Sequence, residues 1–188
     1  MKTKKTISTK EIVIAAMLSA LSLLYIRLMY TVPIPPWSFT PFSHVPLMLG
    51  ILISPFVGIM TCIGTFFGFV WKGSDPIILL RAGSHIFFTL LMIIMLRWGR
   101  YKSAGKLIAL NCIVAVVHAA AEVLAVLVAS WAGISVPADR LGAYYLLLVV
   151  GVGTMGHSTL DFFVAYMFTK VLRRAHFFIE GYGEGKGV

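Results

Sequence analysis

The chain has 188 residues, of which 59% are hydrophobic and 12% are charged. A soluble domain averages about 45–50% apolar and about 25% charged residues, so the composition excludes an ordinary soluble domain and favours a membrane protein. The length fits one domain and leaves no room for a nucleotide-binding module. The formal net charge of +9 comes from short basic clusters between apolar runs, a pattern that indicates membrane orientation rather than nucleic-acid binding.

Apolar runs separated by polar segments predict an all-α bundle of six transmembrane helices. Proline lacks the amide donor of a helix, so the four prolines of residues 31–41 predict an ordered or gating loop. Ser54-Pro55 divides the apolar stretch that follows, because proline is tolerated at a helix start, and two short helices joined by a tight turn are predicted there. The expected helices cover residues 11–30, 44–53, 56–70, 77–98, 106–131 and 141–174.

Both termini are expected in the cytoplasm of a cell that carries this protein in its plasma membrane. Cytoplasmic loops of membrane proteins carry an excess of Lys and Arg, and six helices place three basic clusters on one side, whereas five would split them. Residues 1–10 and 175–188 would then be cytoplasmic segments flanking a transmembrane domain of residues 11–174. The last residues are glycine-rich and expected to be disordered. The first apolar run has no small-residue cleavage site and is expected to be a retained helix. The clusters are Lys2, Lys4, Lys5 and Lys10; Arg97, Arg100, Lys102 and Lys106; and Lys170, Arg173, Arg174 and Lys186.

Ionisable residues inside the predicted spans mark the candidate site. Such groups are expensive in a membrane unless they are paired or hydrated, so they indicate function by default. A spacing of four residues places both members of a pair on one helix face. We expect the three faces to converge on one cavity that opens to the external side. The pairs are Arg81 and His85, His118 and Glu122, and His157 and Asp161.

The residue types in this cavity suit a small aromatic acid. Arginine offers a planar fork for a carboxylate, histidine can pair with a ring nitrogen, and aromatic side chains near Trp37 can stack on a flat ring. Tyr144, Tyr145 and Asn111 are further candidates for the walls. A structural network remains the alternative, in which Arg81 pairs with Glu122 or Asp161 to hold the bundle together.

The predicted first helix carries Ala16 and Ala20 four residues apart. Small residues at this spacing let another helix approach closely. The partner helix can belong to another subunit or to this protein itself, and spacing alone does not separate the two. The two cysteines, Cys62 and Cys112, lie in apolar runs without a CxxC spacing, so neither a disulfide framework nor a zinc ribbon is indicated.

These features resemble the substrate-binding S components of energy-coupling-factor (ECF) vitamin transporters. The likeness covers nearly the whole chain, from the basic N-terminus through the proline-rich loop and Ser54-Pro55 to the three longer polar helices. It implies that Ala16 and Ala20 dock on a transmembrane coupling subunit driven by two ATPases. It also implies a substrate near the external face, with no catalysis and no metal or other cofactor.

Within that family the segments 38–46 and 80–85 look most like the niacin-type S components. The resemblance makes Arg81, His85 and His44 the first choices for substrate contacts. The pairs of the last two helices, His118 with Glu122 and His157 with Asp161, come next. It also makes the loop from Trp37 to Phe42, including Phe39, the expected lid.

Three other functions stay open from the sequence. Four histidines with two carboxylates can bind a metal and activate water, as in an intramembrane hydrolase, although no His-Glu-x-x-His segment is present. A self-sufficient carrier can also bury His/Asp pairs, although no internal repeat is evident. The same family with another vitamin, such as pantothenate or a pyridoxine or pyrimidine type, is the third.

Overall fold

The computed structural model describes residues 6–30, 32–34, 37–98, 103–134, 138 and 141–174. The predicted terminal segments therefore lie largely outside the described residues. Each of the six predicted segments is helical, with ends within three residues of the expected ones. The helices are α1 (Thr9–Leu28), α2 (Val45–Ile53), α3 (Pro55–Lys72), α4 (Pro76–Trp98), α5 (Ala104–Trp131), the π-helix η2 (Tyr144–Val152) and α6 (Gly153–Arg174).

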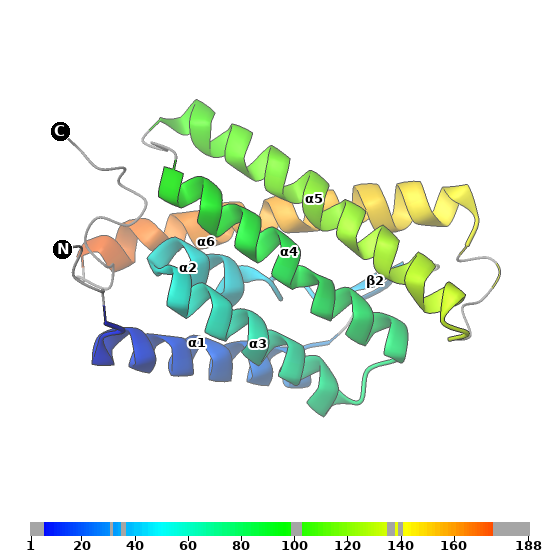
Figure 1. The fold of residues 1–188 in the computed structure, drawn as a ribbon, viewed down its shortest axis with the longest axis horizontal. Helices are drawn as coiled ribbons and strands as arrows, with labels where there is room; N and C mark the ends of the chain where they lie inside the picture. The colour runs from blue at the N-terminus through cyan, green and yellow to red at the C-terminus, as the bar shows by residue number, and fades with distance from the viewer. Residues whose placement is uncertain are drawn as a thin grey trace.

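The proline-rich segment forms a short hairpin rather than an irregular loop. Strand β1 (Val32–Ile34) pairs antiparallel with β2 (Trp37–Phe39), with Val32 opposite Phe39 and Ile34 opposite Trp37. The prediction that this segment is not helical is confirmed. The regular structure of the described residues is thus helical apart from this hairpin, which lies at the end of the bundle opposite the start of α1 (Figure 1).

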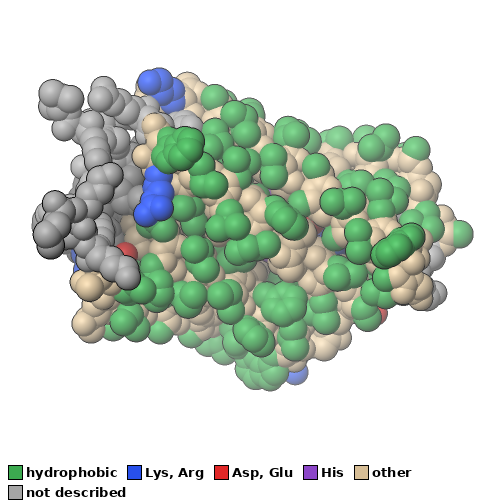
Figure 2. Space-filling model, viewed as in Figure 1, with side chains coloured by type: hydrophobic (Ala, Val, Ile, Leu, Met, Phe, Trp, Pro, Cys, Tyr) green, Lys and Arg blue, Asp and Glu red, His purple; other side chains and the backbone are tan. Residues whose placement is uncertain are grey.

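Five helices among the described residues are long and apolar enough to cross a membrane: α1, α3, α4, α5, and η2 with α6. Large apolar side chains on their outer faces are exposed, and they cover most of the face seen in Figure 2. In water such a surface would drive aggregation, whereas in lipid it is solvated. The protein is therefore a multi-pass membrane protein.

Helix α2 is different, because eight of its nine residues are buried within the bundle. At ~1.5 Å per residue it is roughly 14 Å long, about half of a hydrocarbon core of ~30 Å. It packs against α1, α3, α4 and α6. Leu47, Met48 and Ile51 are fully buried there beside Phe88 of α4 and Phe162 of α6. The α2 helix therefore forms the centre of the bundle and fixes the position of its first turn.

Local sequence accounts for the ends of the helices. Ser8 caps α1 in a capping box with Glu11, in which each side chain accepts from the other residue's backbone N–H. Ser54 ends α2 and caps α3, whose first residue is Pro55, as the predicted tight turn required. Gly73 ends α3 with a positive φ of 74°, a conformation that glycine adopts without steric strain.

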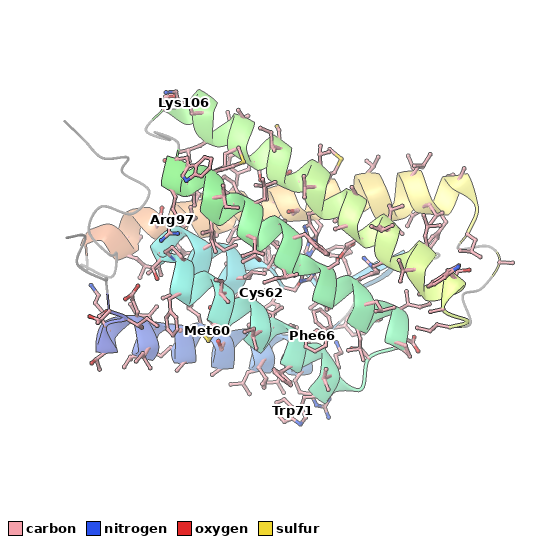
Figure 3. All side chains as sticks on the ribbon, viewed as in Figure 1. Met60, Cys62, Phe66, Trp71, Arg97 and Lys106 are labelled. Carbon is pink, nitrogen blue, oxygen red and sulfur yellow. The ribbon has the colours of Figure 1, made fainter. Side chains whose placement is uncertain are left out.

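The helix ends and connections lie in two groups at opposite ends of the bundle. The first residue of α1 and the last turn of α6 lie at the same end of the molecule (Figure 1). Arg97 and Lys106, on either side of the α4–α5 connection, lie at that end as well (Figure 3). The α3–α4 turn and the hairpin lie at the opposite end (Figure 1).

Helices α1 and α3 approach closely through small residues. The hydroxyls of Ser22 and Thr65 are 2.7 Å apart, and Ser19 Oγ donates to the carbonyl of Met60 at 3.1 Å. A Cβ atom added to Gly64 would lie 2.5 Å from Ser19 Cβ and 2.9 Å from its Cα. Since a backbone atom is involved, no rotamer change relieves this contact.

We predict that Gly64→Ala lowers the thermal unfolding temperature of the detergent-solubilised protein. Overpacking costs about 1–3 kcal/mol, which outweighs the ~1 kcal/mol that alanine contributes over glycine in a helix. Gly83→Ala is the matched control, because its added Cβ would meet only Phe66 at 3.7 Å. It should unfold at the same or a higher temperature than the wild type. Equal effects of the two substitutions would contradict the close α1–α3 packing.

Candidate functional site

His44 immediately precedes α2 and begins the polar cluster. Its backbone N–H donates to Asp161 Oδ2 of α6 at 3.0 Å, and its Nδ1 lies 3.2 Å from the same oxygen. His44 has no capping hydrogen bond of its own, so the Asp161 carboxylate takes the place of a cap at the positive end of the α2 dipole. The buried position of α2 thus keeps the His44 ring in contact with the Asp161 carboxylate.

Arg81 of α4 and Glu122 of α5 form a buried ion pair. Arg81 Nη2 and Nε donate to Glu122 Oε2 at 2.7 and 3.3 Å, and Thr154 Oγ1 donates to the same oxygen. The Arg81 side chain is 17% exposed, against 5% for Glu122. Of the pairings that the sequence left open for Arg81, the structure shows the one with Glu122. The Arg81 guanidinium is the more exposed of the two partners.

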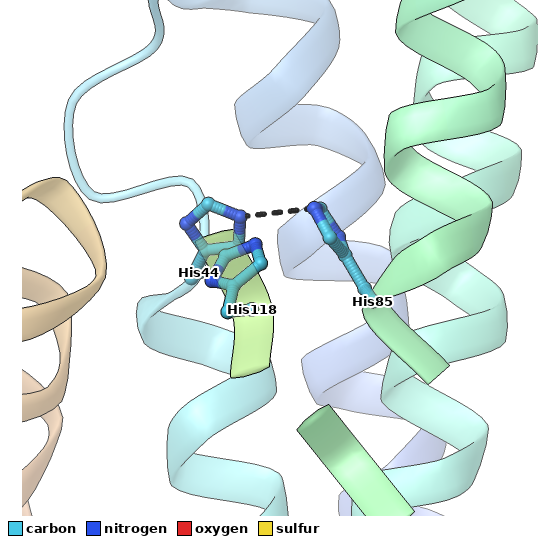
Figure 4. Close-up of side chains that lie close together, drawn as sticks. All are labelled: His44, His85 and His118. Carbon is cyan, nitrogen blue, oxygen red and sulfur yellow. Dashed lines mark hydrogen bonds between the residues drawn. The ribbon is translucent and has the colours of Figure 1, made fainter. Parts of the chain in front are cut away.

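His85 of α4 links these two pairs. Its Nε2 lies 3.3 Å from His44 Nε2 and 3.4 Å from Glu122 Oε1. His118 of α5 lies beside them, with Nδ1 3.2 Å from Ser158 Oγ and Nε2 3.6 Å from Glu122 Oε1. Figure 4 shows the rings of His44, His85 and His118 gathered at one point.

His157 of α6 completes the cluster on the side of the hairpin. Its Nε2 lies 3.3 Å from Ser43 Oγ and 3.4 Å from Asp161 Oδ2. The Phe39 ring of β2 lies against it, with centroids 5.3 Å apart. All three predicted i, i+4 pairs therefore meet in space, together with His44 and Phe39.

A cavity of about 110 Å³ adjoins this cluster. Pockets for drug-sized ligands usually measure about 300–1,000 Å³, so this one suits a much smaller molecule. Its lining includes Phe39 of β2 and Lys72 and Ser74 at the α3–α4 turn, so it lies toward the end of the bundle that carries the hairpin and this turn (Figure 1). Its lining residues are Phe39, Thr40, Ser43, His44, Phe69, Lys72, Ser74, Ile78, Arg81, Ala82, His85, Glu122, Thr154 and His157.

The charges around the cavity nearly balance. With histidines counted as neutral, Arg81 and Lys72 offset Glu122 and Asp161. An anionic ligand would be attracted by Lys72 at the cavity wall and by the part of the Arg81 guanidinium that Glu122 does not use. Its neutral ring would meet the aromatic and imidazole side chains.

Some predicted wall residues are not at the site. Tyr144 is 67% exposed on the outer surface, whereas Tyr145 is 6% exposed. The prediction assumed regular α-helix from Leu141, but the segment is a π-helix, whose i→i+5 bonding changes which residues face inward. Asn111 donates to Thr159 at 3.2 Å and does not line the cavity. Trp37 lies in β2, and its side chain lies outside the described part of the chain.

Other lining residues were not predicted. Thr154 and Ser43 are single hydroxyl residues without a distinctive spacing. Lys72 was not among the expected site residues. A lone lysine at the end of an apolar helix, with a glycine after it, was the available signal.

A comparison with known proteins finds a related transporter. The chain is 30% identical over 177 residues to the niacin transporter NiaX of Lactococcus lactis subsp. cremoris (strain MG1363), covering 93% of this chain and 79% of the relative. The chain belongs to the NiaX family of ECF-transporter S components. No family model and no solved structure matches the chain. Membership in the NiaX family confirms the resemblance found in the sequence.

The buried Arg81–Glu122 pair predicts that Arg81→Ala destabilises this NiaX relative. The substitution leaves the 5%-exposed Glu122 carboxylate without its charged partner, and breaking a buried pair in this way costs about 3 kcal/mol or more. We predict a clear fall in the thermal unfolding temperature. The double variant Arg81→Gln/Glu122→Gln removes both charges and should unfold closer to the wild type. An Arg81→Ala protein as stable as the wild type would show that this ion pair does not hold α4 to α5.

Proposed function

We propose that the protein binds nicotinate from the external side and releases it inward as the substrate-binding subunit of an ECF importer. The observation that carries this proposal is the small cavity, which combines two cations, aromatic rings and imidazoles in a chain related to a niacin transporter. Nicotinate has the matching parts, namely one flat ring, one carboxylate and one ring nitrogen.

The cavity suggests one orientation for the ligand. The Nε and Nη2 of Arg81 contact Glu122, so the Nη1 donors of the guanidinium fork remain for a carboxylate. Lys72 adds a second cation at the same wall. The ring would then lie against Phe39, and its nitrogen would face His85. Charge-assisted contacts at one end and imidazole at the other would distinguish nicotinate from uncharged analogues.

The arrangement of the bundle supports six traverses with both termini in the cytoplasm. The hairpin and α2 follow each other along the bundle from one end through its centre (Figure 1). Together they act as the second membrane crossing, although α2 alone is too short to span the membrane. Arg97 and Lys106 lie at the end where α1 begins (Figure 3), and an excess of basic residues is cytoplasmic. The cavity would then face outside, with residues 11–174 as the membrane domain.

Coupling to the energising module would use α1. Ala16 and Ala20 are exposed on its outer face, whereas Ala15 and Ser19 are turned toward the protein. The small side chains allow a partner helix to approach closely. We propose that this face docks on the transmembrane coupling subunit, which two ATPases drive. The chain itself has no Gly-x-x-x-x-Gly-Lys segment for ATP.

The binding proposal is tested by calorimetry on the purified, detergent-solubilised protein. We expect one nicotinate per chain, with nicotinamide binding at least about tenfold more weakly, because it lacks the carboxylate and hydrogen bonds to charged groups contribute about 1.5–3 kcal/mol. Pantothenate keeps a carboxylate but has no flat ring, so it tests the ring contacts and should also bind more weakly. Arg81→Gln/Glu122→Gln should lose nicotinate binding while remaining folded. Equal binding of nicotinate and nicotinamide would contradict the role of the cations.

The docking proposal is tested by uptake in cells that contain the coupling module. Ala16→Trp should leave nicotinate binding unchanged and abolish uptake, because the indole blocks close helix approach. Val116→Trp is the matched control, since Val116 is 52% exposed on α5, and it should transport normally. If Ala16→Trp transports at the wild-type rate, α1 is not the docking face.

A further inference from the structure

Three histidines from three parts of the chain direct ring nitrogens to one place beside the cavity. His44, His85 and His118 each offer one nitrogen within 4.8 Å of the other two. Their exposed fractions are 5%, 3% and 0%, so this place is shielded from lipid and largely from water. We infer that these histidines form a binding site for a transition-metal ion of the Zn²⁺ class, which goes beyond the binding of a vitamin.

The distance between two of these nitrogens agrees with tetrahedral coordination. Zn²⁺ binds imidazole nitrogen at about 2.0–2.1 Å, which places two tetrahedral nitrogen ligands roughly 3.3 Å apart. The Nε2 atoms of His44 and His85 are 3.3 Å apart, as the dashed line in Figure 4 marks. Two Nε2 atoms at this distance share a single hydrogen at most, whereas a metal ion satisfies the lone pairs of both.

The opposite ring nitrogens of two of the histidines are held by other side chains. His44 Nδ1 lies 3.2 Å from Asp161 Oδ2, and His118 Nδ1 lies 3.2 Å from Ser158 Oγ. Metal-binding histidines usually donate this second N–H to a carboxylate or another acceptor, which fixes the tautomer and the ring orientation. When both Nδ1 atoms donate, each Nε2 presents a lone pair to the cluster. The Nδ1 of His85 has no such partner among the described residues.

His118 provides an independent indication of a missing ligand. Its Nε2 is fully buried and has no hydrogen-bond partner within the described part of the chain. A buried polar atom left unsatisfied costs about 1–3 kcal/mol, so such atoms usually have a reason. A metal ion between His118, His44 and His85 would satisfy it.

Glu122 supplies the fourth donor. Its Oε1 lies 3.4 Å from His85 Nε2 and 3.6 Å from His118 Nε2, while Arg81 and Thr154 both donate to Oε2. Three imidazoles and one carboxylate oxygen form a donor set that suits Zn²⁺ and related ions.

Metal binding is measured without any vitamin, so its outcome is independent of the proposed transport function. The full chain is purified with an affinity tag that contains no histidine, stripped with a chelator and titrated with Zn²⁺ by calorimetry. Co²⁺ provides a second probe, because four-coordinate Co²⁺ has a strong visible absorption. We expect one ion per chain and a four-coordinate Co²⁺ spectrum.

Single substitutions identify the ligands. His118→Ala should weaken Zn²⁺ binding at least about 100-fold, and Ser158→Ala about tenfold, since partners of ligating histidines typically contribute 10–100-fold. His157→Ala is the matched control, because its ring lies 4.8 Å from that of His44, nearly the same as the 5.0 Å for His118. It should bind Zn²⁺ as the wild type does. Thermal unfolding of each variant confirms that it is folded.

Two results would overturn the site. One is the absence of stoichiometric Zn²⁺ and Co²⁺ binding to the stripped wild-type protein. The other is binding that survives His118→Ala but is lost in His157→Ala, which would assign the ion to His44, His157 and Asp161 instead. Nicotinate binding by the metal-free protein would leave the proposed function standing when the metal site fails.

Discussion

The fold depends on the burial of charged and imidazole groups inside an apolar bundle. The Arg81–Glu122 pair joins α4 to α5, and the Asp161 contact to His44 joins α6 to the start of α2. Charges taken out of water cost several kcal/mol each unless good geometry and further hydrogen bonds compensate them. The packing of α4 against α5, and of α6 against the start of α2, therefore has to keep these partners in contact. The packing of short α2 in the middle of the bundle follows from the same constraint, because it delivers His44 to the cluster.

A purely structural role does not account for such a cluster. Apolar side chains of similar volume often hold a bundle equally well, and two histidines that line the cavity each have a ring nitrogen without a hydrogen-bond partner among the described residues, namely His85 Nδ1 and His157 Nδ1. A cavity lies directly against it, with Lys72 and Phe39 in its wall. Unsatisfied groups beside an empty space are what a ligand site requires, since binding then makes contacts that folding left open.

Much of this arrangement could be predicted from the sequence, and the failures have physical reasons. Spacing of four residues indicates which side chains share a helix face, and Arg81, His85 and His157 line the cavity in the structure, whereas Asp161 lies behind it in contact with His44. Proline chemistry correctly placed the turn at Ser54-Pro55. Spacing does not reveal a π-helix, and of the two tyrosines named as wall candidates Tyr144 is exposed on the outer surface whereas Tyr145 is buried. Spacing also does not show which charges pair across helices, so the Arg81–Glu122 contact was only one of the alternatives. For a similar reason Lys72 was missed as a lining residue.

The polar cluster inside the bundle is, in our interpretation, a ligand site. An experimental structure of the full chain with bound nicotinate tests it most directly. The account predicts the ligand in the cavity beside β2, with its carboxylate within hydrogen-bonding distance of Arg81 or Lys72 and its ring against Phe39. A structure with nicotinate bound elsewhere on the protein, and with the cavity beside the intact Arg81–Glu122 pair filled by water or side chains, would contradict it.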